Sequence, residues 1–568
     1  MKFQLNRLAA SLALAAAGAA AAALPVTANA APAPSENATI NLIRLLVQQG
    51  VLKPEQADAL VAQAEAEAKA ARAAPQDRGA AVAQAGDVRV PYIPQTVRDQ
   101  IRDEVKAEVM VQAKEENWAQ PNTFPDWVSR ITIDGDVRVR DESRLYSGGN
   151  SNEIVDFAKL NAKGPYDLNR NTNSNYPPML NTREDRRNQL RVRARLGVRA
   201  DISEAWTAGI RLATGSDDSP VSTTQTLGGG MGKKDIWLDQ AYLTYRPAKW
   251  ATVTGGRIAN PFESTDMLFS NDLNFDGVAA IFKHPLEGRD VTLFGTLGAF
   301  STEYGSNGWN SSSFSEGKSE DKWLLAAQAG ADWKIDSRNS VRGALAYYHF
   351  DNIAGKRSSP CSPWAGQENC DTDWSRPAFM QKGNTLFLLR DITSNPQDPA
   401  NTPQPQYVGL ASKFDLLDLN LRWDTRVFNG LGLRVNANYI RNLAYSKSKM
   451  MNRSQGNIVN NFGENGDVES GPNAWMLQAT LGRSYDLKEK GDWLAFVGYK
   501  YIQPDALPDA FNDSSFHQGG TNARGYYIGG GYAFDKNVYG VLRWMSTREI
   551  YGAPLSIDTM QFEINARF

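Results

Sequence analysis

The chain has 568 residues, of which 47 are glycine and 10 % are aromatic, and its 61 Lys and Arg residues nearly balance 63 Asp and Glu residues, leaving a formal net charge of −2. This balance gives no electrostatic reason for nucleic-acid binding, and a mean hydropathy of −0.46 excludes a protein built of membrane-spanning helices, which need about 20 apolar residues each. Two cysteines exclude a thiolate metal cluster or a disulfide-dense fold, and three histidines leave little material for a histidine-based active site.

Residues 1–30 have the organisation of a secretory signal peptide. Lys2 and Arg7 precede the apolar stretch Leu8–Leu24, and Ala28-Asn29-Ala30 places small residues at the two positions that a signal peptidase reads. We expect cleavage after Ala30 and export from the cytoplasm. The alternative, an uncleaved membrane anchor, is disfavoured by Pro25 and by the alanine-dominated core.

Residues 31–120 have the period of helices rather than strands. Val97, Ile101, Val105 and Val109 recur every four residues among charged side chains, which predicts an amphipathic helix with a narrow apolar stripe. Such a stripe packs either against another copy, as in a coiled coil, or along the rest of the same chain, and both alternatives stay open. We expect a periplasmic helical segment and linker here, and a homo-oligomer, with a trimer favoured.

From Trp127 to the last residue the period of the apolar residues is two. The clearest segments are 130–140, 189–201 and 559–568, in which apolar residues alternate with charged or polar ones. Successive side chains of a strand point to opposite faces, so each segment has one apolar and one polar face. A strand of a soluble β-sandwich would show the same pattern. The number and length of all such segments therefore have to decide between a soluble sandwich and a membrane-spanning barrel.

About sixteen such segments of roughly 9–11 residues follow one another, the length that crosses a bilayer at ~45°. Short connections alternate with long polar loops, as in bacterial outer-membrane barrels. The sequence therefore predicts an all-β transmembrane antiparallel barrel over residues 127–568. The expected strand centres are Asp134, Ala194, Ile210, Ala241, Val253, Ala279, Gly295, Ala327, Leu345, Leu419, Val435, Leu477, Val497, Gly530, Leu542 and Ile564.

Several stretches resemble the putative-porin family of Gram-negative outer-membrane channels. They are Leu238-Asp239-Gln240-Ala241-Tyr242-Leu243, Gly255-Gly256-Arg257 with Asn260-Pro261-Phe262, Asp272-Leu273-Asn274-Phe275-Asp276-Gly277-Val278, Lys382-Gly383-Asn384-Thr385-Leu386 and Gly409-Leu410-Ala411. The resemblance implies passive channel activity in the outer membrane, with outer-membrane lipid and small hydrophilic solutes as partners. The terminal Phe568 is similar to the assembly signal of porins, which implies the barrel assembly machinery as a further partner.

Other motifs that suggest chemistry do not meet its requirements. Gly228–Lys234 is similar to a phosphate loop, but its glycine spacing is one residue short and Lys234 replaces the Ser or Thr. His284, His349 and His517 have no Ser or Cys partner placed by local sequence. We therefore expect no catalytic residue, no cofactor and no metal site.

The most informative set of charged residues is a ladder of arginines. Arg191, Arg193, Arg195 and Arg199 share the parity opposite the apolar one, which faces the lumen in a barrel. A row of fixed positive charge in a pore favours anions. In the alternative interpretation, Asp134, Asp136 and Asp201 pair with arginines and cancel their field. The full predicted strip is Arg138, Arg140, Arg191, Arg193, Arg195, Arg199 and Arg211.

Acidic residues lie in or beside the segment after Ile258, namely Glu263, Asp266, Asp272 and Asp276. By analogy with porins, this loop is expected to fold into the pore as a constriction. An acidic loop opposite a basic wall would create a transverse field that orients dipolar solutes.

The two cysteines lie in the longest predicted loop. Cys361 and Cys370 are accompanied by Pro360, Pro363 and Gly366, so a compact loop can bring them together. In an exported segment they are expected to form a disulfide. The alternative is two free thiols.

Together these features predict a general-diffusion porin with mild anion preference. The alternative is a plugged barrel that acts as an adhesin or a structural anchor of the outer membrane. Single-channel conductance distinguishes the two.

Overall fold

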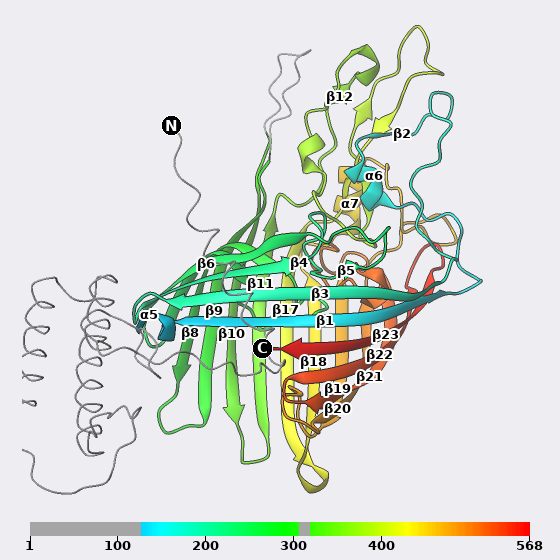
Figure 1. The fold of residues 1–568 in the computed structure, drawn as a ribbon. Helices are drawn as coiled ribbons and strands as arrows, with labels where there is room; N and C mark the ends of the chain where they lie inside the picture. Colours follow the sequence, from blue (N-terminus) through cyan, green and yellow to red (C-terminus); the bar gives the residue numbers. More distant parts are fainter. Residues whose placement is uncertain (1–125, 306–318) are drawn as a thin grey trace, which may run out of the picture. The chain divides into compact units, whose positions relative to one another are not determined.

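The computed structural model describes residues 126–305 and 319–568 (Figure 1). A short helix, α5 (Asp126–Ser129), precedes the first long strand, which begins at Ile131. The period of two therefore starts a few residues after Trp127. The predicted signal peptide and the helical segment 31–120 lie outside the described residues.

Sixteen long strands of the described ranges form one closed antiparallel sheet, as predicted. They are β1 (Ile131–Tyr146), β3 (Arg186–Asp201), β4 (Trp206–Thr214), β6 (Ile236–Ala248), β7 (Ala251–Ala259), β8 (Asn274–Pro285), β9 (Val291–Glu303), β10 (Lys322–Lys334), β11 (Ser340–Asp351), β17 (Phe414–Val427), β18 (Leu431–Asn442), β19 (Asn473–Gly482), β20 (Trp493–Ile502), β21 (Ala523–Asp535), β22 (Val538–Glu549) and β23 (Ser556–Arg567). Each pairs with its neighbours in chain order, and β1 closes the barrel by pairing with both β3 and β23. Each predicted centre falls in a different one of these strands.

Some strands are longer than the 9–11 residues predicted. β1 and β3 have 16 residues each, and they stay paired as far as Glu142 opposite Gln189 and Arg144 opposite Arg186. These charged and polar ends extend the ribbon beyond the apolar band, because backbone pairing does not depend on the surrounding lipid.

The connections at one end of the strands are mostly short, and those at the other end are mostly long. The short turns are 202–205, 249–250, 286–290, 335–339, 428–430, 483–492 and 536–537, and the other connections are 147–185, 215–235, 260–273, 304–321, 352–413, 443–472, 503–522 and 550–555. In bacterial barrels short turns face the periplasm and long loops face outward.

The two faces of the barrel wall differ as the period predicts. On β1, Val137 and Val139 are 41 % and 47 % exposed on the outer face, whereas Asp136, Arg138 and Arg140 on the inner face are 9 % exposed or less. Such an apolar outer surface is stable only against lipid, and burying it removes about 25 cal/mol per Å² of unfavourable hydration. No helix within the described ranges is both long enough and apolar enough to span a bilayer.

Aromatic side chains mark both ends of the outer face. Trp206 stacks on Tyr245 at 4.5 Å between ring centroids near the short turns, and Trp475 stacks on Tyr499 and Tyr501 at 5.4 and 6.1 Å near the long loops. Amphipathic rings prefer the headgroup zone of a bilayer, so these two belts mark its two interfaces.

The remaining short elements lie in the long loops, except η3. They are β2 (Tyr166–Asp167), α6 (Phe157–Ala162), β5 (Gln225–Thr226), β12 (Pro360–Cys361), η1 (Pro363–Ala365), η2 (Asp373–Ser375), β13 (Leu386–Leu388), β14 (Asp391–Ile392), β15 (Pro405–Gln406), β16 (Val408–Leu410), η3 (Phe428–Gly430), α7 (Lys447–Ser454) and η4 (Phe516–Gln518). Figure 1 shows α6, α7, β2 and β12 gathered beyond the same end of the barrel strands.

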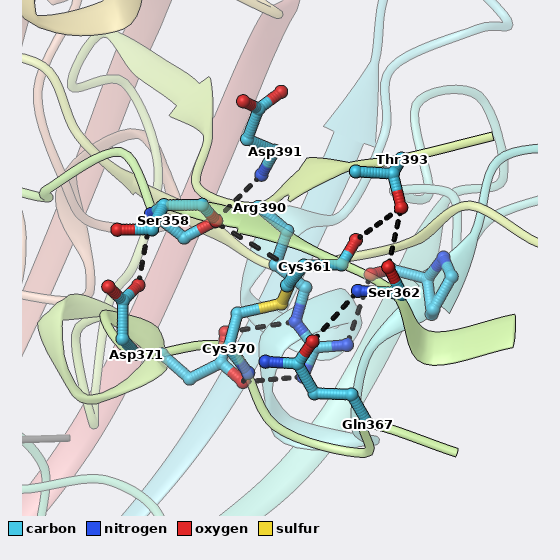
Figure 2. Close-up of a disulfide and its surroundings, with 12 residues drawn as sticks. Ser358, Cys361, Ser362, Gln367, Cys370, Asp371, Arg390, Asp391 and Thr393 are labelled. Atoms are coloured by element: carbon cyan, nitrogen blue, oxygen red, sulfur yellow. Dashed lines mark hydrogen bonds and ion pairs between the residues drawn. A yellow bond between two sulfur atoms is a disulfide. The ribbon is translucent and has the colours of Figure 1, made fainter. Parts of the chain in front are cut away.

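Cys361 and Cys370 form a disulfide in the longest of these loops, with their Cα atoms 5.8 Å apart (Figure 2). The buried guanidinium of Arg390 lies beside the disulfide and pairs with Asp373 at 2.5 Å. Ser362, next to Cys361, accepts or donates a 2.6 Å hydrogen bond with Thr393. These polar contacts and the disulfide together hold the outer part of loop 352–413 in one arrangement.

The C-terminal Phe568 completes the pairing of β23 with β1. Its backbone exchanges two hydrogen bonds of 3.0 Å with Gly135, and its ring lies where a Cβ on Gly135 would be only 2.5 Å away. Glycine at position 135 therefore leaves room for the terminal ring, which stays largely exposed at the short-turn end of the barrel.

Candidate functional site

The arginine ladder lies on the inner faces of two adjacent strands. Arg138 and Arg140 on β1 are directly opposite Arg193 and Arg191 on β3, and Arg195 follows on the same face. Like charges at opposite positions of a strand pair destabilise it, so the ladder requires carboxylates between its members.

Three wall carboxylates supply this compensation. Asp136 binds Arg193 and Arg195 at 2.7 and 2.6 Å. Glu563 on β23 binds Arg140 at 2.8 Å and lies 3.8 Å from Arg138. Glu142 is almost fully buried among arginines, with ion pairs to Arg144, Arg191 and Arg140 at 2.7, 2.9 and 3.8 Å.

The other two predicted members do not join this cluster. Arg211 on β4 pairs with Asp239 on β6 at 2.5 Å, and Arg199 lies exposed near the short-turn end of β3. Of the acids considered as partners, Asp136 pairs with the ladder, whereas Asp201 accepts a hydrogen bond from Thr207 at 2.9 Å.

The loop 260–273 crosses the interior of the barrel. It leaves β7 and first reaches β11 and β17, half-way round the barrel from β1 in strand order. There Glu263 lies between Arg342 and Arg422, at 2.9 and 3.6 Å. Gln328 on β10 donates to the Glu263 carbonyl at 2.8 Å. This acid therefore contacts the wall opposite the ladder.

The middle of the loop contacts the next part of the wall. Thr265 donates to Asn438 on β18 at 2.6 Å, and Asp266 forms a 2.8 Å ion pair with Lys500 on β20. Burial raises the pKa of Asp266, but Lys500 and then Arg543 outweigh this effect and hold the pKa below its usual value. Asp266, Lys500 and Arg543 line one cavity of about 90 Å³, which Asp513 and Phe516 of loop 503–522 also border.

The end of the loop returns to the ladder. Asp272 lies 3.4 Å from both Arg193 and Arg195 and accepts hydrogen bonds from the Thr223 amide and hydroxyl at 3.1 and 3.0 Å. Burial raises its pKa, but Arg193, the Thr223 amide and Arg195 together lower it below the usual value. Asp272 therefore stays charged at neutral pH and neutralises part of the ladder by direct contact rather than across an open pore.

Asp276 does not belong to this loop. It lies on β8, shares the parity of the exposed Val278, and pairs on the outer face with Arg257 at 2.7 Å. The sequence prediction placed Asp276 in or beside the loop and grouped it with the constriction acids.

An aromatic cluster holds the loop against the wall. Phe262 packs edge-on against Phe275, Phe300 and Tyr348 at 6.1, 6.0 and 5.3 Å, and Phe269 packs against Tyr348 at 5.3 Å. All five are buried. The inner wall is therefore apolar where the loop packs on β8, β9 and β11, and charged at the ladder and at the residues opposite it.

The sequence prediction missed the charged residues opposite the ladder. Arg342, Arg422 and Arg434 lie on the inner faces of β11, β17 and β18, and Arg434 pairs with Asp424 at 2.6 Å. None of these three strands repeats arginine at every second position, as β3 does. In β17, Leu419, Leu421 and Trp423 alternate with polar residues, and this alternation could have predicted that Arg422 faces the inside of the barrel.

Three outer loops meet above the barrel around two buried carboxylates of loop 503–522. Asp505 accepts hydrogen bonds from the amide and hydroxyl of Thr385 at 3.0 and 2.6 Å and from Ser470. The Asp509 amide donates to Asn384 at 2.8 Å, but the carboxylate oxygen Oδ2 of Asp509 is buried without a hydrogen-bond partner in the described chain.

This arrangement predicts that the loop contact weakens as pH rises. Burial, with a smaller contribution from Asp505, raises the pKa of Asp509 to about 7 from its usual 3.8. The backbone of Gln381, and then that of Asn384 and the charge of Lys382, oppose the shift. Because the pKa of Asp509 is raised in the packed loop, its protonated carboxyl contributes its full stabilisation below the usual pKa of 3.8. This stabilisation is lost as the pH rises through about 7. We expect loop 503–522 to be cleaved faster by protease at pH 8 than at pH 5, relative to the Asp509→Asn variant at each pH. A wild-type to variant ratio independent of pH would contradict this.

The described residues contain no group of three or more His, Cys, Asp and Glu side chains that could hold a metal ion. Two histidines have polar partners: His349 pairs with Asp415 at 2.5 Å, and the buried His517 hydrogen-bonds Thr547 at 2.9 Å. What the interior offers is an array of fixed charges around a crossing loop, which can attract, repel and orient ions.

Residues 36–568 match a family model described as "Putative porin". No curated protein matches the chain in sequence. Solved structures with a similar fold include OprB of Pseudomonas putida, at 12 % identity and a TM-score of 0.39, covering 78 % of this chain and 95 % of that one. The outer membrane channel DcaP of Acinetobacter baumannii has 10 % identity and a TM-score of 0.34, with 77 % and 97 % covered. Scores this low carry no argument beyond the barrel topology already described.

Proposed function

The chain belongs to the putative porin family, and on that premise we propose that this outer-membrane channel is a general-diffusion porin with a mild preference for anions. Small hydrophilic solutes move down their gradient through the space left by loop 260–273, and no chemical step is involved. Selectivity follows from the width of that space and from the charges beside it.

The charge balance of the arginine ladder carries the proposed anion preference. Six guanidiniums meet four carboxylates there, which leaves an excess of two positive charges on one wall. Neighbouring positions of equal parity on a strand are about 6–7 Å apart, within a Debye length of ~8 Å at physiological salt, so their fields add. The cluster consists of Arg138, Arg140, Arg144, Arg191, Arg193 and Arg195 with Asp136, Glu142, Asp272 and Glu563.

Replacing Arg191, Arg193 and Arg195 together by Glu should move the reversal potential in a KCl gradient toward cation preference. The matched control is Arg257→Glu, because Arg257 lies on the outer face and pairs with Asp276 away from the ladder. We expect the control to leave the reversal potential unchanged. An equal shift in both proteins, or none in the triple variant, would mean that the ladder does not border the conducting path.

The competing function, a plugged barrel that serves as an adhesin or anchor, draws support from the outer loops. Leu386, Leu507 and Val408 of these loops share one buried apolar cluster with Phe262 of the crossing loop. Single-channel recording in a planar bilayer separates the two: stepwise conductance supports the porin, and its absence in folded protein supports the plug.

The proposal extends to the ends of the chain and to assembly. Residues 1–30 direct export, residues 31–120 form a periplasmic helical segment, and Phe568 is recognised by the barrel assembly machinery. The favoured oligomer is a trimer. Cross-linking of the purified protein, with and without residues 31–115, tests whether that segment strengthens the oligomer.

A further inference from the structure

Two arginines stand side by side on the outer face of the barrel, at the end that carries the long loops. Arg524 on β21 is directly opposite Arg548 on β22. Arg524 shares the parity of the exposed Tyr526 and Ile528, and Arg548 shares that of the exposed Leu542. We call Arg524 and Arg548 the rim pair. Neither belongs to the charged interior.

The rim pair has no partner that balances its charge. In the described ranges neither guanidinium forms an ion pair, and the Nε atom of Arg524 is buried without a hydrogen-bond acceptor. Like charges directly opposite on neighbouring strands destabilise the sheet. Inside the barrel the same arrangement, Arg140 opposite Arg191, is relieved by Glu142. The rim pair lacks such a carboxylate, so an anion from outside the chain would supply the missing charge.

The surroundings of the rim pair suit a lipid headgroup. Tyr501 lies opposite Arg524 on β20, and Tyr499 and Tyr526 form the next row toward the membrane. Tyr499, Tyr526 and the rim pair line a cleft of about 560 Å³. Below them the rows become apolar, with Ile528 opposite Trp544 and Trp544 opposite Met560. The cleft therefore lies where the aromatic belt meets the lipid-facing band.

One acidic residue also lines the cleft. Asp558 on β23 lies opposite Ser546, one row below Arg548, and no ion pair joins it to either arginine. Two guanidiniums against one carboxylate leave the cleft positive. Planar guanidiniums bind phosphate through paired, charge-assisted hydrogen bonds, which suits two of them held side by side.

We propose that the rim pair, with Tyr499 and Tyr526, binds the phosphate of a phosphorylated glycolipid in the outer leaflet of the outer membrane. The long loops place this end of the barrel at the outer leaflet. The acyl chains would lie along the apolar rows below the cleft while the phosphate neutralises the rim pair. This site is independent of the channel and of its ion preference.

Binding of bisphosphorylated lipid A to the purified detergent-solubilised protein, followed by native mass spectrometry, tests the proposal. The double variant Arg524→Gln and Arg548→Gln should weaken binding about tenfold or more, since each guanidinium contributes charge-assisted hydrogen bonds. The matched control is Arg441→Gln, an exposed outer-face arginine on β18 that donates a 3.5 Å hydrogen bond to Asn473. It should leave binding unchanged.

Further arms separate phosphate from other ligands. Dephosphorylated lipid A should bind the wild-type protein as weakly as bisphosphorylated lipid A binds the double variant. The proposal is overturned if the double variant binds normally, if Arg441→Gln loses as much, or if inorganic phosphate alone competes at equal concentration. It is also overturned if the double variant changes only the oligomeric state, because the rim pair would then contact another copy.

Folding of the double variant offers a second readout. Removing two opposed positive charges should leave the lipid-free barrel at least as stable as the wild type, whereas added lipid A should raise the unfolding temperature of the wild type more than that of the variant. Equal stabilisation of both proteins by lipid A would contradict a role for the rim pair.

Discussion

Replacing Leu477 by arginine is expected to destabilise the barrel by roughly 2–4 kcal/mol, the cost of a basic side chain on the lipid face near the bilayer midplane. Leu477 is central in β19 and 52 % exposed on the outer face. An arginine there would have to desolvate its charge in hydrocarbon or bend toward an interface. Urea unfolding of the protein in lipid vesicles measures the change in the free energy of unfolding.

The matched control is the neighbouring residue on the opposite face. Gln478 accepts a 2.8 Å hydrogen bond from Tyr527 and donates a 3.1 Å hydrogen bond to Thr480 inside the barrel. Gln478→Arg should cost only about 1–2 kcal/mol, the order of the hydrogen bonds lost. Equal costs at the two positions would show that the outer face of β19 does not contact lipid.

The fold could be predicted because lipid and water impose opposite demands on alternate residues of each strand. In the last strand, Met560, Phe562 and Ile564 are exposed on the outer face while Gln561 and Asn565 are buried inside. A one-residue error in register would reverse every side chain, so each strand centre was well determined. Strand ends were less certain, since β1 and β3 stay paired beyond the apolar band.

The inward direction of the arginines could be predicted by the same alternation, but their partners could not. Arg140 meets Glu563 from the far end of the chain, and Arg193 meets Asp272 from a loop that must first fold inward. These contacts depend on barrel closure and on the path of loop 260–273. Local periodicity contains neither, which is why the sequence left open whether acids would cancel the ladder.

Asp276 shows that closeness to a loop in sequence does not place a side chain in the pore. β8 begins at Asn274, so Asp276 is the third residue of a strand and faces outward beside Arg257. Its place beside the loop in sequence was enough to group it with the acids of the pore. The aromatic residues Phe262, Phe269 and Phe275 were equally visible in the sequence, but their common cluster depends on Tyr348 and Phe300 from distant strands.

Truncating Phe262 is expected to release the crossing loop without unfolding the barrel. Phe262 is 7 % exposed, and its ring fills the space between Phe275, Phe300 and Tyr348. Phe→Ala at a buried site costs about 3–5 kcal/mol through lost contacts and the cavity left behind. Because the sixteen-stranded sheet is closed by its own backbone pairing, this cost falls mainly on the docking of loop 260–273.

Single-channel recording and limited proteolysis together measure this release. In Phe262→Ala we expect a larger conductance with more current noise, and new cleavage within residues 260–273 of the folded protein. Phe262→Leu, which keeps most of the apolar volume, should remain close to the wild type. Unchanged conductance with new cleavage would mean that the loop lies outside the conducting path. No change in either would mean that the ion pairs of Glu263, Asp266 and Asp272 hold the loop without the aromatic cluster. We expect both a larger conductance and new cleavage. The charged contacts fix where the loop touches the wall, but the buried rings supply most of the free energy that keeps the loop there.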